Sequence, residues 1–269
     1  MKVVLFCGGL GLRLHPTTEN VPKPLVLIGE KPVLWHLMKY YSYFGHKDFI
    51  LCLGYKGEEI KKFFLDYECL SNDFILTHGG KRQQLCKSDI EDWRITFVDT
   101  GFHSNVGQRL KAVQKYVEND EMFLANYSDG LTDLPLPKLI DFFIKHEKTG
   151  CFLAPKPFLV FHIISTDTDS CVKSICSMSQ SNLRINGGFF VFKNKIFDYI
   201  KDGEDLVNEP FQRLIKKREL VAYEYDGFWA SLDTYKDKQR LNELVTNHSA
   251  SWQIWEHQSQ KLSGEKEGA

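Results

Sequence analysis

Residues 2–14 read KVVLFCGGLGLRL, a short apolar run that ends in a glycine-rich turn. An uninterrupted apolar run of this length is typical of a strand buried on both faces, and such strands belong to the sheets of α/β proteins. Glycines directly after such a strand let backbone N–H groups approach a phosphate or a base closely. The turn is therefore either a ligand loop or simply a tight turn, and both readings are open on these residues alone.

The spacing of the glycines excludes two familiar phosphate loops. Leu14 stands where a dinucleotide fingerprint that starts at Gly9 and Gly11 needs its third glycine. No Gly-Lys-Ser or Gly-Lys-Thr follows, so the segment is not a Walker A loop either. Arg13 adds a planar fork of donors that suits a phosphate.

Strand and helix patterns alternate along the rest of the first half. Apolar runs at 49–53, 95–98 and 121–127 predict strands, and amphipathic spacing at 33–41, 57–67, 107–117 and after 137 predicts helices. This alternation indicates a mostly parallel sheet with helices on both faces. The second half is richer in strands, at 151–155, 160–164, 172–176, 187–192 and 220–225, with helices at 195–200, 209–217 and from about 234.

Composition limits the classes of function. The 269 residues carry 34 Lys+Arg and 35 Asp+Glu, and this net charge of -1 argues against a nucleic-acid or acidic-membrane partner. No apolar run approaches the ~18 residues of a membrane span. The seven cysteines form no C-x-x-C pair, which indicates reduced thiols. We expect a cytoplasmic protein without a signal peptide, with one domain over 1–257 and a polar tail over 258–269.

Three further residues have an ordinary and a chemical interpretation. Lys23 stands between Pro22 and Pro24, where it is either a solvated side chain or a cation held for a phosphate. Asp129 follows the strand at 121–127, at the edge where open α/β sheets bind ligands, but it also suits a turn before a glycine. Asp233 precedes the last long helix, where it is either a residue that caps the helix N-terminus, which is common, or a carboxylate of a ligand site.

Taken together, these segments resemble the sugar-phosphate nucleotidyltransferases, and within them the glucose-1-phosphate cytidylyltransferases. The resemblance rests on the glycine-rich turn with Arg13, on Pro22-Lys23-Pro24, and on Gly29-x-x-Pro32. It continues to about Trp255 through the segments 34–39, 47–50, 54–57, 98–101, 107–110, 186–191 and 227–229. It implies a Rossmann-like three-layer α/β fold with a mostly parallel, mixed sheet, a nucleotide half over about 1–130 and a strand-rich acceptor half over about 131–257.

The resemblance also implies an activity: CTP and glucose 1-phosphate react to CDP-glucose and pyrophosphate, with Mg²⁺ as cofactor. Asp129 and Asp233 would hold the metal, and Arg13 and Lys23 would neutralise the phosphates. The residues implied in nucleotide binding are Gly8, Gly9, Leu10, Gly11, Leu12, Arg13, Lys23, Ser104, Gly107, Arg109 and Asp129. Asn186 and Gly187 would contact the acceptor, and relatives are commonly homo-oligomers.

The sequence departs from the family pattern mainly in the acceptor half. Leu12 and Val106 replace threonines, and Ser177-Met178-Ser179 stands where a Glu-Lys-Pro normally supplies a lysine for the sugar phosphate. Lys173 or Arg184 are the candidates to replace that cation. Two alternatives therefore stay open: a cytidylyltransferase that acts on another phosphorylated acceptor, and a nucleotide-binding regulatory protein without turnover.

Overall fold

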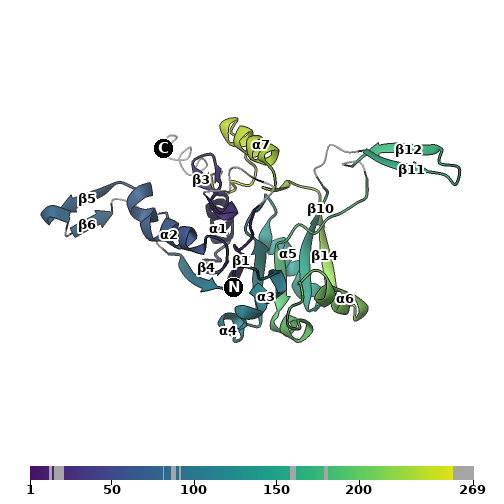
Figure 1. The fold of residues 1–269 in the computed structure, drawn as a ribbon, viewed down its shortest axis with the longest axis horizontal. Helices are drawn as coiled ribbons and strands as arrows, with labels where there is room; N and C mark the ends of the chain where they lie inside the picture. Colours follow the sequence, from purple (N-terminus) through teal and green to yellow (C-terminus); the bar gives the residue numbers. More distant parts are fainter. Residues whose placement is uncertain are drawn as a thin grey trace, which may run out of the picture.

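A seven-stranded sheet forms the centre of the computed structural model (Figure 1). The structure describes residues 1–11, 14, 21–80, 82–85, 89–90, 92–157, 162–178 and 181–256. The strands follow the order β14 (Leu220–Tyr225), β10 (Gly150–Pro155), β13 (Phe190–Lys193), β8 (Met122–Tyr127), β1 (Lys2–Phe6), β4 (Asp48–Leu53) and β7 (Arg94–Asp99). Only β13 runs antiparallel to its neighbours in this sheet, β10 and β8, and the other pairs are parallel.

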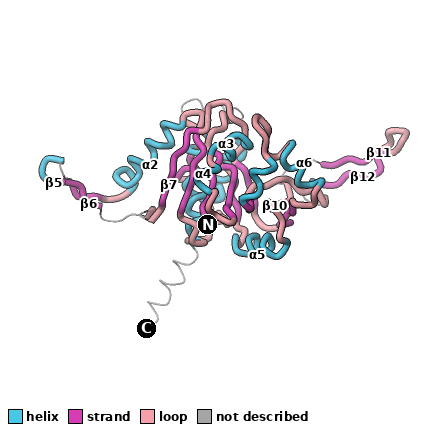
Figure 2. The backbone as a smooth tube through the Cα atoms, turned by 90° about the horizontal axis from the view of Figure 1, so that it is seen from below, coloured by secondary structure: helices cyan, strands magenta, loops and turns pink. Residues whose placement is uncertain are grey.

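The side chains of β1 show why the sheet is covered on both faces. Val3 and Leu5 belong to one buried cluster, whereas Val4 and Phe6 belong to another on the opposite face. The first cluster receives α1 (Val33–Tyr43), α2 (Gly57–Ser71) and α5 (Leu136–His146). The second receives α3 (Val106–Ala112), α4 (Gln114–Val117), α6 (Glu209–Lys216) and the 3₁₀ turn η5 (Asn194–Tyr199). Figure 2 shows α5 on one side of the strands and α3 and α6 on the other. The expected three-layer α/β fold is confirmed.

Four short two-stranded pairings complete the architecture. Two of them lie near the carboxyl end of the central sheet: β2 (Leu27–Ile28) with β3 (Lys31–Pro32), and β9 (Gly130–Thr132) with β15 (Trp229–Ser231). The other two are hairpins that project at opposite ends of the long axis (Figure 1): β5 (Phe74–Thr77) with β6 (Arg82–Leu85), and β11 (His162–Thr166) with β12 (Val172–Ser177). The remaining elements are η2 (Lys23–Leu25), η3 (His78–Gly80) and the last helix, α7 (Tyr235–Thr246).

The strands expected in the second half take two different places. Those at 151–155 and 187–192 join the central sheet as β10 and β13, so this sheet draws strands from both halves of the chain. Those at 160–164 and 172–176 form the projecting hairpin β11–β12, with 160 and 161 outside the described residues. The helix expected at 195–200 is the 3₁₀ turn η5. Among the described residues, no helix has the length and apolar character needed to span a bilayer.

Candidate active site

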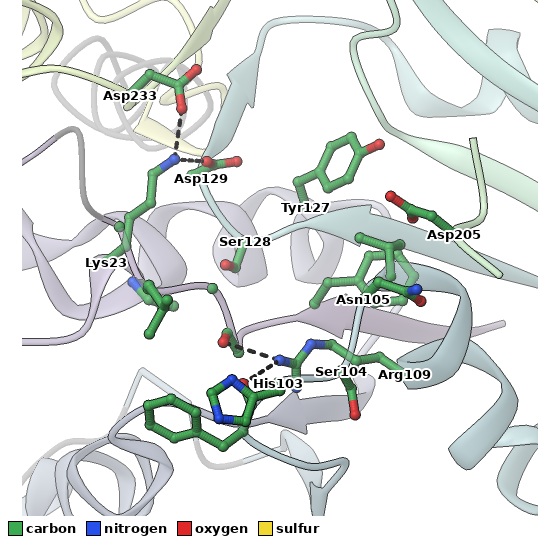
Figure 3. A pocket seen from close by; sticks show the side chains of 18 residues that line it. Lys23, His103, Ser104, Asn105, Arg109, Tyr127, Ser128, Asp129, Asp205 and Asp233 are labelled. Carbon is green, nitrogen blue, oxygen red and sulfur yellow. Dashed lines mark hydrogen bonds and ion pairs between the residues drawn. The ribbon is translucent and has the colours of Figure 1, made fainter. Parts of the chain in front are cut away.

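A cavity of about 630 Å³ opens beyond the carboxyl ends of β1 and β8 (Figure 3). Of the residues singled out in the sequence, it is lined by Gly8, Gly9, Leu10, Gly11, Lys23, Ser104, Arg109, Asp129 and Asp233. Further lining residues are Phe6, Pro24, Phe102, His103, Asn105, Val106, Tyr127, Ser128 and Asp205. Gly107, Asn186 and Gly187 do not line it, and Leu12 and Arg13 lie outside the described residues.

The β9–β15 pairing brings the two candidate metal ligands together. Asp129 directly precedes β9, and Asp233 lies two residues after β15. Gly130 pairs with Ser231, and the Leu232 N–H donates to the Asp129 carbonyl at 3.0 Å. Ser231 then donates from Oγ to Asp233 Oδ2 at 2.8 Å. Two carboxylates from opposite halves of the chain are thus fixed side by side.

Lys23 occupies the space between these carboxylates. Its ammonium donates to Asp129 Oδ2 and, at 2.8 Å, to Asp233 Oδ1 (Figure 3). Pro22 is extended and Pro24 lies within η2, so the backbone around the lysine has few alternatives. Burial by itself lowers the pKa of the Lys23 ammonium, but the two carboxylates outweigh burial and raise the pKa above its usual value. Lys23 is therefore a fixed cation at the mouth of the cavity.

The same pair of carboxylates fits a divalent cation. Both side chains already converge on one positive charge. They are mostly buried, since 17% of the Asp129 side chain and 25% of the Asp233 side chain is exposed. Mg²⁺ takes oxygen ligands and is commonly held by one or two carboxylates together with substrate phosphates and water. No group of three or more His, Cys, Asp or Glu side chains suited to a metal occurs in the described part of the chain. Asp129 and Asp233 therefore match the pattern of a site completed by a phosphorylated substrate.

The three glycines of the turn have different roles. At Gly8, a Cβ would lie 2.1 Å from the Arg109 guanidinium, so a side chain there would displace this buried group. Gly11 has φ of 63°, which favours glycine. A Cβ on Gly9 would meet nothing within 4 Å, so this residue leaves room for a ligand. Gly9 is therefore the residue of the turn whose backbone a ligand in the cavity can approach.

Arg109 is a buried connection between the cavity walls. Its guanidinium donates to Gly8 O at 3.1 Å, to Leu53 O at 2.9 Å, and to Thr100 Oγ1 at 2.8 Å. It also donates to Gly101 O at 3.0 Å. Burial lowers the pKa of this guanidinium from its usual value. Arg109, which the resemblance implied in nucleotide binding, thus holds the glycine-rich turn against the loop after β7.

Ser104 and Gly107 also hold the loop that forms the lower wall in Figure 3. Ser104 donates from Oγ to the Thr100 carbonyl at 2.5 Å, within its own loop. Gly107 begins the turn of α3, and a Cβ there would lie 2.3 Å from the Glu204 carbonyl. Both residues shape the cavity wall through packing and backbone contacts.

Of the two predicted acceptor residues, Asn186 contacts a residue of the cavity wall and Gly187 does not, within the described part of the chain. Asn186 donates from Nδ2 to the hydroxyl of Tyr127 at 3.3 Å, and Tyr127 lines the cavity. Burial raises the pKa of Tyr127 to about 12, so its hydroxyl stays protonated at neutral pH. Gly187 accepts from the Trp229 indole at 2.9 Å, and a Cβ there would lie 2.5 Å from Pro155.

The two cations suggested for the missing lysine lie elsewhere. Arg184 donates to the Tyr225 carbonyl at 2.8 Å and pairs with Asp226 at 2.9 Å and Glu224 at 3.4 Å. Lys173 is an exposed residue of β12, on the projecting hairpin. Neither lines the cavity.

Sequence reasoning missed Asp205, Tyr127, Asn105, Phe102 and His103. Tyr127 immediately precedes the Ser-Asp-Gly turn, and residues 102, 103 and 105 lie next to Ser104, which the resemblance already implied in nucleotide binding, so their position carried a usable signal. Asp205 belongs to no motif, and its place in the cavity follows only from the packing of residues 203–208.

Comparisons with known proteins identify the family of this chain. The family pattern of the nucleotidyl transferases matches residues 2–247. Glucose-1-phosphate cytidylyltransferases from Salmonella typhi and Salmonella typhimurium are each 41% identical over 258 residues, which cover 95% of this chain and 100% of theirs. A mannose-1-phosphate guanylyltransferase catalytic subunit beta from Drosophila melanogaster is 25% identical over 88% of this chain and 60% of its own.

Solved structures show the same fold. The apo form of a UDP-glucose pyrophosphorylase aligns with a TM-score of 0.66 at 15% identity, over 92% of this chain and 99% of that one. HddC from Yersinia pseudotuberculosis, complexed with GMP-PN, aligns with a TM-score of 0.64 at 21% identity, over 91% and 99%. The match to the family over nearly the whole chain and the identity to the two Salmonella enzymes show that this chain belongs to the nucleotidyl transferase family.

Proposed function

We propose that the protein is a Mg²⁺-dependent cytidylyltransferase that converts CTP and glucose 1-phosphate into CDP-glucose and pyrophosphate. The observation that carries the proposal is the cluster of Lys23, Asp129 and Asp233 at the mouth of the cavity. The nature of both substrates is taken from the Salmonella relatives, whose names specify glucose 1-phosphate and cytidylyl transfer.

The reaction requires placement and charge neutralisation more than covalent chemistry. An oxygen of the acceptor phosphate attacks the α-phosphorus of the nucleotide, the bond to the bridging oxygen breaks, and pyrophosphate leaves. Mg²⁺ held by Asp129 and Asp233 would supply charge neutralisation at the phosphates. Lys23, and Arg13 from the glycine-rich turn, would pair with the phosphate oxygens and hold the α-phosphate in line with the attacking oxygen.

Lys23 has a second role in this scheme, because it already bridges the two aspartates. A phosphate that enters would offer the ammonium oxygens in exchange for those of both carboxylates. The two aspartates would then be available to hold the metal. A cation that is fixed before the substrate arrives needs little reorganisation during the reaction.

A panel of substrates tests the proposal. Pyrophosphate release would be measured with CTP, UTP, dTTP, ATP and GTP, each combined with glucose 1-phosphate, other sugar 1-phosphates and phosphorylated small molecules. We expect turnover to be fastest with CTP and glucose 1-phosphate and to stop when EDTA removes divalent cations. Failure of every pair to release pyrophosphate, with CTP still bound in calorimetry, would instead support the nucleotide-binding regulatory protein.

A different acceptor is the second candidate, and one observation favours it. Ser177 and Met178 stand in the place of the usual lysine-containing segment. Of the two candidate replacements, Arg184 is engaged by Asp226 and Glu224, and Lys173 is an exposed residue of the projecting hairpin. In the same panel, turnover of another phosphorylated acceptor with a higher kcat/KM than glucose 1-phosphate would establish this alternative.

We further propose a homo-oligomeric, cytoplasmic protein whose two halves act as one domain over 1–257. The β5–β6 hairpin supports the oligomer: Phe74, Ile75 and Leu76 are each more than 40% exposed, and an isolated two-stranded hairpin is marginally stable in water. A second copy of the chain would cover these side chains. Free thiols at the six described cysteines are consistent with a reducing compartment.

A further inference from the structure

Asp205 is the acidic residue of the cavity that lies outside the Lys23 cluster. It lines the same cavity, on the side away from Lys23 and Asp233 in Figure 3 and on the same side as Tyr127 and Asn105. Its Oδ1 atom is buried and has no hydrogen-bond partner among the described residues. Buried carboxylate oxygens without a partner are rare. Asp205 as a residue lines the cavity, so a ligand bound there can supply the donors that this carboxylate lacks in the described part of the chain.

Neighbouring residues hold the segment that carries Asp205 in place. The Glu204 carbonyl packs against Gly107, and the Glu204 carboxylate pairs with Arg213. Asn105, the cap of α3, donates from Nδ2 to the Gly203 carbonyl at 2.9 Å, and Leu206 is fully buried. These contacts on both sides fix the backbone at Asp205, so the residue has a defined place on the cavity wall before any ligand arrives.

The chemistry around Asp205 selects the kind of ligand group. A carboxylate repels phosphate, so the phosphates belong at the Lys23 end of the cavity, where a cation is fixed. A flat base has aromatic neighbours at Phe102 and His103, which line another part of the wall (Figure 3). Asp205 instead shares its side of the cavity with the Tyr127 ring, and an aromatic ring next to a carboxylate suits a sugar with hydroxyl groups.

We propose that Asp205 accepts a hydrogen bond from a hydroxyl group of a substrate sugar and thereby selects substrates that carry that hydroxyl. The hydroxyl belongs either to the ribose of the nucleotide or to the pyranose of the acceptor, and the two share the same chemistry. The inference rests on the proposed function for the identity of these substrates. Asn186 supports a location near the acceptor, because its amide donates to the hydroxyl of Tyr127 on the same wall.

A cycle of variants and deoxy substrates tests this contact. The proteins are the wild type, Asp205→Ala and Asp205→Asn, with Asp202→Asn as the matched control, because Asp202 is 94% exposed and lies three residues away. The ligands are CTP, 2′-deoxy-CTP and 3′-deoxy-CTP, and glucose 1-phosphate with its 2-, 3-, 4- and 6-deoxy forms. Nucleotide binding is measured by calorimetry, and kcat/KM by pyrophosphate release.

We expect the wild type and Asp202→Asn to lose about tenfold or more in affinity or kcat/KM when the contacted hydroxyl is removed. Asp205→Ala should have an affinity or kcat/KM for the parent substrate that is lower than that of the wild type by a similar factor. Removal of the same hydroxyl should then lower the affinity or kcat/KM of this variant by less than about twofold. Asp205→Asn should lie between, because its amide oxygen still accepts. A coupled 2′- or 3′-hydroxyl assigns the contact to the nucleotide, and a coupled pyranose hydroxyl assigns it to the acceptor.

Two results overturn the inference. One is equal losses in wild type and Asp205→Ala for every deoxy ligand. The other is a preference for CTP over UTP that collapses in Asp205→Ala, which would place the cytosine amino group at Asp205. Because calorimetry does not require turnover, absence of pyrophosphate release in the wild type refutes the proposed function and still leaves the ribose contact measurable. Melting temperatures of the variants identify any loss that comes from unfolding.

Discussion

At the scale of single residues, the ammonium of Lys23 neutralises two carboxylates that would otherwise repel each other. Two neighbouring carboxylates that are mostly removed from water repel each other, and without a cation between them this repulsion destabilises the folded protein. The lysine therefore serves both the stability of the empty protein and the binding of phosphate. The prolines on both sides of Lys23 are visible in the sequence. No local pattern shows that the lysine pairs with Asp129 and Asp233, which come from distant segments.

Replacement of Lys23 by methionine should separate these two roles. We expect kcat/KM for the nucleotide to fall by roughly a hundredfold, because one fixed cation at the phosphates is lost. The two aspartates should then take up Mn²⁺ more tightly in the absence of nucleotide, which electron paramagnetic resonance can follow. Lys47→Met, which removes an exposed partner of Asp92, is the control for loss of a lysine. Unchanged kcat/KM in Lys23→Met would remove this residue from the reaction.

His36 should make stability depend on pH. The residue is buried, its Nε2 donates to the Ile28 carbonyl at 2.9 Å, and its Nδ1 accepts from the Trp252 indole at 3.5 Å, so the neutral ring satisfies both partners. Burial, with a smaller contribution from the charge of Lys31, lowers the pKa of His36 from 6.5 to about 4. Between these values the unfolded chain binds a proton that the folded protein does not. The free energy of unfolding should therefore fall as pH drops from 6.5 towards 4.

Because of this one histidine, the free energy of unfolding changes by at most about 1.4 kcal/mol per pH unit. Urea unfolding of the wild type and of His36→Gln is measured between pH 4.5 and 7.5. The difference between the two free energies of unfolding isolates the contribution of His36, because the contributions of other titrating groups cancel. His46 is one such group, since burial and the charged N-terminus lower its pKa to about 4 as well. Parallel curves for the two proteins would show that His36 does not contribute.

At the scale of elements, the start of α3 is positioned by its contact with residues 204–206. Gly107 lets the helix approach the Glu204 carbonyl so closely that any side chain would collide with it. Asn105 caps the helix and at the same time binds Gly203. The loop that lines the cavity is thus set by a segment almost a hundred residues further along the chain.

Gly107→Ala should therefore destabilise the protein by about 1–3 kcal/mol, as overpacking commonly does. Gly9→Ala is the matched comparison, because a Cβ there meets nothing within 4 Å. Chemical unfolding of both variants at pH 7.5 measures the difference. Equal unfolding midpoints for the two variants would mean that the contact between α3 and residue 204 can relax without loss of stability.

The elements that the sequence predicts well are those with a local pattern. Continuous apolar runs identify β1, β4 and β8, and helical spacing identifies α1, α2 and α5. The direction of β13 and the pairing of β9 with β15 depend on contacts between distant segments, and no local signal specifies them. The hairpin β5–β6 has no buried face along β5, so the alternation that reveals a half-buried strand is missing.

The same distinction applies to the candidate site. Motifs placed the glycine-rich turn, Lys23, Asp129 and Asp233 at one location, and these residues do line one cavity. The partners of Arg109 are mostly backbone carbonyls, which every residue carries and no motif marks. Asp205 is placed by tertiary packing alone, so sequence reasoning passed over it.

At the scale of the whole molecule, the two hairpins extend the protein at both ends of its long axis (Figure 1). Their exposed apolar side chains include Ile75 and Leu76 on β5 and Ile164 and Ile175 on β11–β12. Such side chains are costly to keep in water along an unsupported hairpin, and covering them by a second copy would stabilise both chains.

Sedimentation measures this directly. We expect the wild type to sediment as a species larger than the 31.2 kDa chain. The double substitution Ile75→Ser and Leu76→Ser should shift it to a smaller species and leave far-UV circular dichroism unchanged. Ile215→Ser on α6 controls for loss of an exposed apolar side chain elsewhere. A wild type that sediments as a single chain at micromolar concentration contradicts the expectation.

The β9–β15 pairing has a consequence for synthesis of the protein on the ribosome. Asp129 emerges when about half of the chain has been made, but the strand that holds its partner in place ends at Ser231. Until that segment leaves the exit tunnel, the nascent chain has one carboxylate and a lysine, and its half-built sheet lacks β14. Under the proposed function, a chain that ends before Asp233 would lack one of the two carboxylates for the metal, so fragments from premature termination would not compete for the nucleotide.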